Sequence, residues 1–206
     1  MLEAGESARG PRKARAWSPR LNTQHSAFIL HASSFRLTHS PVTLFHMLLS
    51  ISRFLQLLSM GLFTGILFGD RVGVAHIRPQ LPASAFVLYQ QGVHSRFVYL
   101  MPVLIITSLL AGVISLVFLR RDYQSRAFIF TLIAILCTVG VVILTRLINV
   151  PVNETMMTWN AASPPENVMQ LWAPWEGSHT IRTILAVLGF ASLAYSTTTP
   201  KPKDIV

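Results

Sequence analysis

Apolar residues gather in four long segments of the chain, and most polar residues lie between them. The segments cover residues 44–69, 97–119, 127–149 and 175–198. A helix needs about 20 mostly apolar residues to cross the hydrocarbon core of a bilayer, and each segment is long enough. The pattern therefore predicts an all-α fold, a membrane bundle of four transmembrane helices with two long outer loops.

The composition supports a membrane protein. Of the 206 residues, 51% are hydrophobic and only 12% are charged, whereas an ordinary soluble domain carries about a quarter charged residues. This excludes a disordered chain, a disulfide-stapled mini-protein and most soluble enzymes. The single cysteine, Cys137, lies inside an apolar segment, and we interpret it as a small packed hydrophobic residue.

The charges predict an orientation in the membrane. The chain has 17 Lys and Arg against 8 Asp and Glu, which in a soluble protein would suggest nucleic acid. Here the basic residues gather before the first segment, between the second and third, and after the fourth, whereas residues 149–180 contain no Lys or Arg. By the positive-inside rule both termini face the cytoplasm and the long loops face out. We expect the plasma (inner) membrane, a lipid bilayer as partner and no nucleic acid.

The chain divides into three parts. Residues 44–198 form the membrane domain, and residues 199–206 a cytoplasmic tail. Residues 1–43 are rich in Arg and Ser and show no sustained apolar period. They are either a transit-type or membrane-surface segment, or a disordered extension or over-called start with the real beginning at Met47. We favour the second interpretation.

Two features of the first segment concern packing. Gly61 and Gly65 lie four residues apart, a spacing that lets two helix backbones approach closely. Arg53 lies about two turns inside the segment, and we expect its guanidinium to extend to the inner membrane surface. Neither feature predicts a chemistry.

Three residues that open the fourth segment share one helix face. Trp175, His179 and Arg182 have i, i+4 and i+7 spacing. Ionisable residues at membrane depth are costly and by default mark functional or partnered positions. We therefore expect this face to point into the bundle or its mouth. The alternative is an interfacial anchor, because Trp belts and terminal Arg residues are common at membrane boundaries.

Polar residues also surround a proline at the end of the third segment. Pro151 has no backbone N–H and is expected to end or kink the helix, with Asn149 and Asn153 on either side. Broken helices with polar flanks are found where they line a cavity, although Asn and Pro are also common in caps and turns. The loop that follows carries Trp159 and Trp172. We interpret this loop either as an ordered lid at the membrane interface or as a plain aromatic belt.

Together these elements resemble the anthrone oxygenase-like family of membrane proteins. The resemblance covers about residues 47–195 and rests on Gly61 and Gly65, Pro79-x-Leu81 with Gln90, Asn149-x-Pro151-x-Asn153, and Trp175-x-x-x-His179-x-x-Arg182. It implies a four-helix membrane protein. It also implies a link to anthrone chemistry, since some fungal members convert anthrones to anthraquinones with O2, while most bacterial members have no established activity.

This chemistry suggests roles for the candidate residues. The doubly benzylic proton of an anthrone is acidic because the anion is an aromatic phenolate, which reduces O2 directly without a metal or flavin. We hypothesise that His179 is the base, because histidine titrates near neutral pH. Arg182, Asn149 and Asn153 would stabilise the oxyanion.

The expected substrate contacts follow from the same hypothesis. Trp175 and Trp172 would form aromatic walls, and Gln90 and Arg146 are further expected substrate-binding residues. The hypothesis predicts no cofactor and no metal, with a small planar aromatic molecule and O2 as partners.

Two other classes remain open. His94 and His179 lie at the predicted outer ends of the second and fourth segments, and two imidazoles could ligate a haem. A non-enzymatic protein, such as a permease, a partner subunit or a ligand-binding protein, would use His179 and Arg182 for stability or assembly. The sequence contains no GxGxxG, P-loop, GxSxG or HExxH motif, so soluble catalytic templates find no support.

Overall fold

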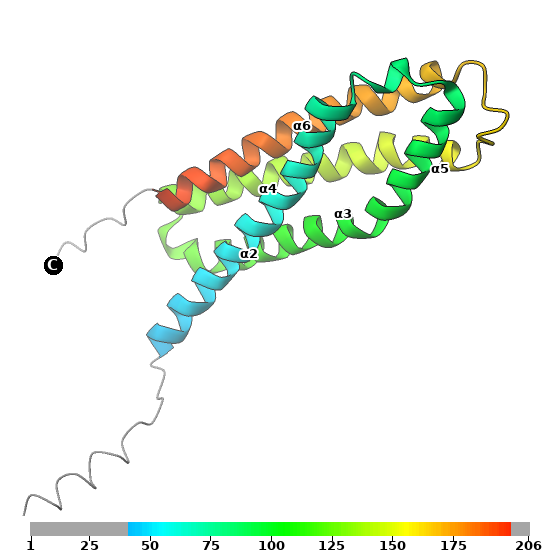
Figure 1. Ribbon diagram of the computed structural model, residues 1–206. Coiled ribbons are helices and arrows are strands. Elements are labelled where there is room, and N and C mark those ends of the chain that lie inside the picture. Colours follow the sequence, from blue (N-terminus) through cyan, green and yellow to red (C-terminus); the bar gives the residue numbers. More distant parts are fainter. Residues whose placement is uncertain (1–40, 199–206) are drawn as a thin grey trace, which may run out of the picture. The chain divides into compact units, whose positions relative to one another are not determined.

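The computed structural model describes residues 41–198, which fold into helices with no β-strand in that range (Figure 1). The α-helices are α2 (Pro41–Gly69), α3 (Ala83–Leu119), α4 (Arg126–Leu144), α5 (Val150–Met157) and α6 (Val168–Thr198). Residues 1–40 of the predicted extension 1–43, and the predicted tail, 199–206, lie outside the described residues. Residues 41–43 belong to α2 instead.

Four helical stretches are long and apolar enough to cross a membrane. They are Val42–Val74, Ala83–Asp122, Arg126–Met157 and Val168–Thr198. The predicted all-α bundle of four transmembrane helices is therefore confirmed, and the protein is an integral membrane protein. The orientation of its termini stays a prediction.

The four long helices pack side by side. Helix α2 contacts α3 and α6, and α4 contacts α6 and α3. Helix α2 begins and α6 ends at one end of the bundle, which we call the terminal end (Figure 1). Arg53 joins these two helices there, since its Nη2 donates to the backbone oxygen of Ser196 at 3.0 Å. Arg53 is thus bound to α6 rather than extended freely to the membrane surface.

At the opposite end the helices are longer than the predicted spans. A π-helical turn, η1 (Asp70–Val74), continues α2, while α3 begins at Ala83 and α6 at Val168. The connections between helices at this end are short. They cover residues 75–82, which include a 3-10 turn, η2 (Arg78–Gln80), and residues 158–167. Continued helix satisfies backbone hydrogen bonds that a loop near the membrane would leave open.

Pro151 was predicted to end or kink the third helix, and the helix does not end there. A π-helical turn, η4 (Thr145–Asn149), follows α4, and the N–H of Val150 donates to the oxygen of Thr145. Pro151 then lies in the first turn of α5. A proline is tolerated in a first turn because its missing N–H has no required partner there, so the chain stays helical to Met157.

The closest packing involves glycines other than the predicted pair. A Cβ on Gly189 would meet the Met60 side chain and lie 3.0 Å from Cys137 Cβ. Gly61, in contrast, faces only the Phe190 ring, and Gly65 has nothing within 4 Å. The predicted close approach through Gly61 and Gly65 is therefore wrong, because a phenyl ring fills one position and the other is open.

A substitution at Gly189 should destabilise the bundle. We expect Gly189→Val to cost about 1–3 kcal/mol, because the added methyl groups overpack a filled core. Gly92→Val is the matched control, since Gly92 is also helical but has nothing within 4 Å of an added Cβ. Equilibrium unfolding in detergent measures the difference, and equal losses for the two variants would contradict the prediction.

Candidate functional site

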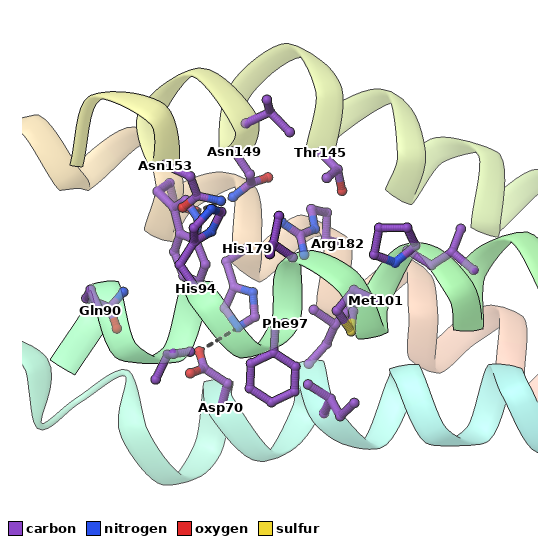
Figure 2. Close-up of a pocket in the computed structure, with 18 of the residues that line it drawn as sticks. Asp70, Gln90, His94, Phe97, Met101, Thr145, Asn149, Asn153, His179 and Arg182 are labelled. Atoms are coloured by element: carbon purple, nitrogen blue, oxygen red, sulfur yellow. Dashed lines mark hydrogen bonds and ion pairs between the residues drawn. The ribbon is translucent and has the colours of Figure 1, made fainter. Parts of the chain in front are cut away.

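A cavity of about 820 Å³ lies between the four long helices at the end away from the termini. Figure 2 shows residues from all four around it. All eight predicted site residues line it: Gln90, Arg146, Asn149, Asn153, Trp172, Trp175, His179 and Arg182. Residues from distant parts of the chain therefore meet at one place, while the role of each stays a prediction.

His179 lies at the base of this cavity against an acidic residue. Its side chain is only 2% exposed, and its Nε2 is 3.0 Å from Oδ2 of Asp70, where α2 gives way to η1 (Figure 2). This is an ion-pair distance, although the ring N–H is not aligned for a hydrogen bond. Nδ1 is buried and has no hydrogen-bond partner within residues 41–198. One nitrogen thus faces a carboxylate, and the other is unengaged.

Arg182 is a buried cation that forms no ion pair within residues 41–198, although the charge of Asp70 acts on it. The residue is 7% exposed, and its Nε is buried with no hydrogen-bond partner in the described part of the chain. A buried guanidinium without a paired anion is strongly disfavoured. Because Arg182 lines the cavity, the arrangement favours an anion, or a developing negative charge, inside it.

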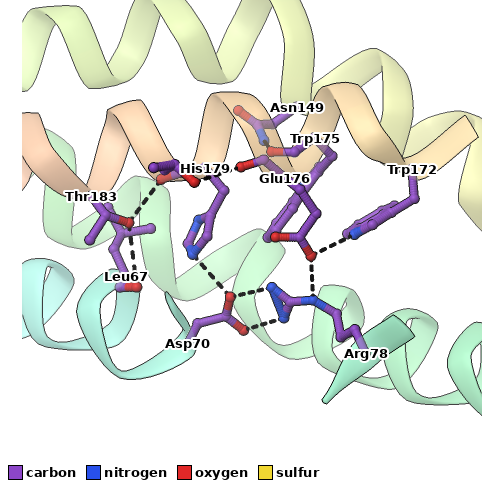
Figure 3. A network of polar contacts seen from close by, with 10 residues as sticks. Leu67, Asp70, Arg78, Asn149, Trp172, Trp175, Glu176, His179 and Thr183 are labelled. Atoms are coloured by element: carbon purple, nitrogen blue, oxygen red, sulfur yellow. Dashed lines mark hydrogen bonds and ion pairs between the residues drawn. The ribbon is translucent and has the colours of Figure 1, made fainter. Parts of the chain in front are cut away.

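A polar network fixes Asp70. Arg78 donates to both its oxygens, from Nη1 at 2.8 Å and from Nη2 at 2.6 Å. The Nε of Arg78 donates to Oε1 of Glu176 at 2.6 Å, and Trp172 Nε1 donates to the same oxygen at 3.1 Å (Figure 3). Arg78 is 1% exposed. The network therefore joins the end of α2, the connection before α3, and α6.

Sequence reasoning did not identify this network. The motifs in the sequence assigned no role to Arg78, Glu176 or Asp70. One signal was available: Asp70 directly follows the apolar segment 44–69, and an acid at such a boundary is a candidate partner for a buried cation. Which cation it binds depends on how the helices pack.

Aromatic rings continue the site away from His179. Trp175 stacks on His179 with ring centroids 4.7 Å apart, and Trp172 stacks on Trp175 at 4.5 Å. Trp172 and His179 lie on opposite sides of Trp175 along α6, so both faces of the Trp175 ring are covered. A planar molecule would meet the edge of Trp175, and the stack limits the rotation of His179.

Asn149 links the π-helical turn to α6. It is 1% exposed; its Nδ2 donates to the oxygen of Trp175 at 3.3 Å and its Oδ1 accepts from Ser178 Oγ at 2.8 Å. Both ends of its amide are thus engaged with α6. Asn153, one turn further along, is half-buried and also lines the cavity.

Two other predicted residues differ in their burial. Gln90 is buried, and its Oε1 has no partner within the described residues. Arg146 is exposed at the rim of the cavity.

The sequence profile of a known family, described as Anthrone oxygenase, matches residues 76–192, more than half of the chain. The chain belongs to the anthrone oxygenase family. This confirms the resemblance drawn from the motifs around Asn149 and His179. The match includes Arg78, Glu176 and Arg182, whereas Asp70 precedes it. No curated protein and no solved structure matches the chain.

The site also bears on the metal and haem alternatives. Within residues 41–198, no group of three or more His, Cys, Asp or Glu side chains is placed to hold a metal ion. His94 lines the same cavity as His179. A haem bound by these two histidines would give a Soret band in the absorption spectrum of the purified protein.

Loss of Arg78 should destabilise this end of the bundle. We expect Arg78→Met to cost about 3 kcal/mol, because breaking a buried ion pair leaves its carboxylates without a cation. Arg71→Met is the matched control, since Arg71 is exposed in the neighbouring turn. Unfolding in detergent measures both, and a loss for Arg78→Met no larger than for the control would refute the structural role.

Proposed function

We propose that this member of the anthrone oxygenase family is a cofactor-independent oxygenase that oxidises an anthrone-like planar aromatic substrate with O2. The observation that carries the proposal is the buried Arg182, which forms no direct ion pair among the described residues and shares a largely apolar cavity with His179. Family membership supports the substrate class.

The first step is removal of the benzylic proton. His179 Nε2 faces Asp70, so a proton on Nε2 leaves the lone pair on Nδ1 to accept the substrate proton. The Asp70 carboxylate, held by Arg78, stabilises the imidazolium that forms, as the acid of a catalytic triad does. Asp70 is thus a positioning residue, and His179 is the base.

The second step places negative charge on the substrate oxygen. The electron pair left by the proton delocalises to form a phenolate, and Arg182 donates to that oxygen. Such preorganised donors act strongly where water is excluded. We assign this role chiefly to Arg182, with Asn153 as a second candidate donor in the cavity, because the amide of Asn149 is already engaged by α6.

The remaining steps balance without a further reactant. The carbanion form transfers electrons to O2, a C–O bond forms, and the peroxide takes the proton from His179 to give a hydroperoxide. Loss of the second proton from the same carbon then breaks the O–O bond and forms the carbonyl, and the leaving hydroxide takes up that proton as water. Substrate and O2 thus give quinone and water.

Replacing His179 should abolish turnover. We expect His179→Gln to lower enzyme-dependent O2 uptake about 100-fold or more, the usual contribution of a positioned base. The assay uses detergent-purified protein, a model anthrone and excess EDTA, with uncatalysed autoxidation subtracted. His76→Gln is the control, since His76 is exposed and does not line the cavity.

Two results of this assay would overturn the proposal. Full activity in His179→Gln would remove His179 as the base. A Soret band in the purified wild type would favour the haem alternative through His94 and His179.

Replacing Arg182 should lower kcat more than it changes KM. We expect Arg182→Gln to lower kcat by about 10²–10³, the cost of losing one oxyanion donor, while Arg182→Lys keeps part of the activity because it keeps the charge. Arg96→Gln, an exposed arginine on α3 outside the cavity lining, serves as control. Steady-state O2 uptake separates the two constants, and a change confined to KM would count against the oxyanion role.

A further inference from the structure

The cavity reaches the side of the bundle between α3 and α4. On α3 its lining includes Val98, Pro102 and Ile106, which have i, i+4 and i+8 spacing and therefore form one stripe. These residues are also exposed on the outside of the bundle, Val98 to 42% and Ile106 to 54%. Facing them across the cavity are Val142 and Arg146. We call the gap between these two edges the side opening.

A proline explains why α3 leaves this gap. Pro102 lies inside α3 and cannot donate to the carbonyl of Val98, four residues earlier, so the helix bends there. Figure 1 shows α3 changing direction part-way along its length. The bend lies in the middle of the stripe that borders the side opening.

Counted from the end of α3, two residues of the stripe lie within one hydrocarbon thickness. Ile106 and Pro102 are 13 and 17 residues before the end of α3 at Leu119, which corresponds to about 20 and 26 Å at 1.5 Å per residue. The hydrocarbon core of a bilayer is about 30 Å thick. The neighbouring outward residues Val103 and Leu110 are about 60% exposed and apolar, as expected for a lipid-facing surface.

We propose that the side opening admits the substrate laterally from the bilayer, and that the substrate class is a neutral, lipid-soluble planar aromatic. This inference rests on the proposed function for the reaction that follows entry. Four of the five residues named at the opening are apolar, which favours an uncharged molecule, and Arg146 is the charged one. Arg182 lines the same cavity and would meet a negative charge on the substrate only after the proton has been removed. The cavity volume of about 820 Å³ falls in the range usual for small-molecule sites.

The test blocks the side opening and measures ligand entry without relying on turnover. Ile106→Trp and Val98→Trp place an indole at the opening, and Leu110→Trp is the control, one turn along the same helix but outside the cavity lining. The proteins are reconstituted in phosphatidylcholine vesicles. The probes are a neutral hydroxyanthraquinone and its sulfonated, membrane-impermeant analogue, followed by stopped-flow fluorescence.

We expect both blocking variants to slow association of the neutral probe about tenfold or more, with Leu110→Trp unchanged. Ile106→Ala, which widens the opening, should bind at least as fast as wild type and shows that position 106 tolerates change. The sulfonated probe should bind poorly to wild type. O2 uptake with a neutral anthrone should fall in parallel in the blocking variants.

Several outcomes would overturn the inference. Equal association rates in Ile106→Trp and Leu110→Trp, or sulfonated probe binding as fast as the neutral one, would place entry at an aqueous mouth instead. A co-purifying phospholipid that is lost in Ile106→Trp, without binding of the neutral probe, would assign the opening to lipid. If the neutral probe binds rapidly, the blocking variants slow its binding, and no O2 is consumed, lateral entry would stand and only the proposed oxygenase activity would be refuted.

Discussion

One buried guanidinium holds the cavity end of the bundle together. Arg78 binds both oxygens of Asp70 and one oxygen of Glu176, a geometry available to arginine because its donors form a rigid planar fork. A cation buried to this extent is tolerated only while its carboxylates remain in place. The position of α6 against the end of α2, and with it the wall that carries His179, therefore depends on this contact.

The same contact shapes the electrostatics of the cavity. Asp70 lies between two basic side chains, since Arg78 binds it and His179 approaches it at 3.0 Å. Glu176 is directed at Arg78 and Trp172. Within residues 41–198 Arg182 forms no ion pair, and Asp70 is the acidic group that acts on its charge. The proposed oxyanion role of Arg182 uses this lack of a direct ion pair.

Two sets of contacts on α6 fix the position of the His179 side chain. The stack of Trp172, Trp175 and His179 packs three rings along one helix face and restricts the imidazole to an orientation that reaches Asp70. A second set of contacts holds α6 against the π-helical turn η4. There Asn149 hydrogen-bonds the backbone oxygen of Trp175 and the hydroxyl of Ser178. π-helical turns often occur at functional sites because they re-aim side chains, and here the turn brings an amide onto α6.

The sequence by itself determined the helices and the faces they bury. Hydropathy located four spans, and i, i+4, i+7 spacing placed Trp175, His179 and Arg182 on one stripe, because both signals are local. Only the tertiary structure decided that Asp70, Arg78 and Glu176 form one network, that Gly189 rather than Gly61 packs most closely, and that the faces of Trp175 are covered. These features join residues far apart in the chain; the Arg78–Glu176 hydrogen bond alone spans 98 positions. They depend on how helices rotate and pack against one another, which hydropathy and periodicity do not encode.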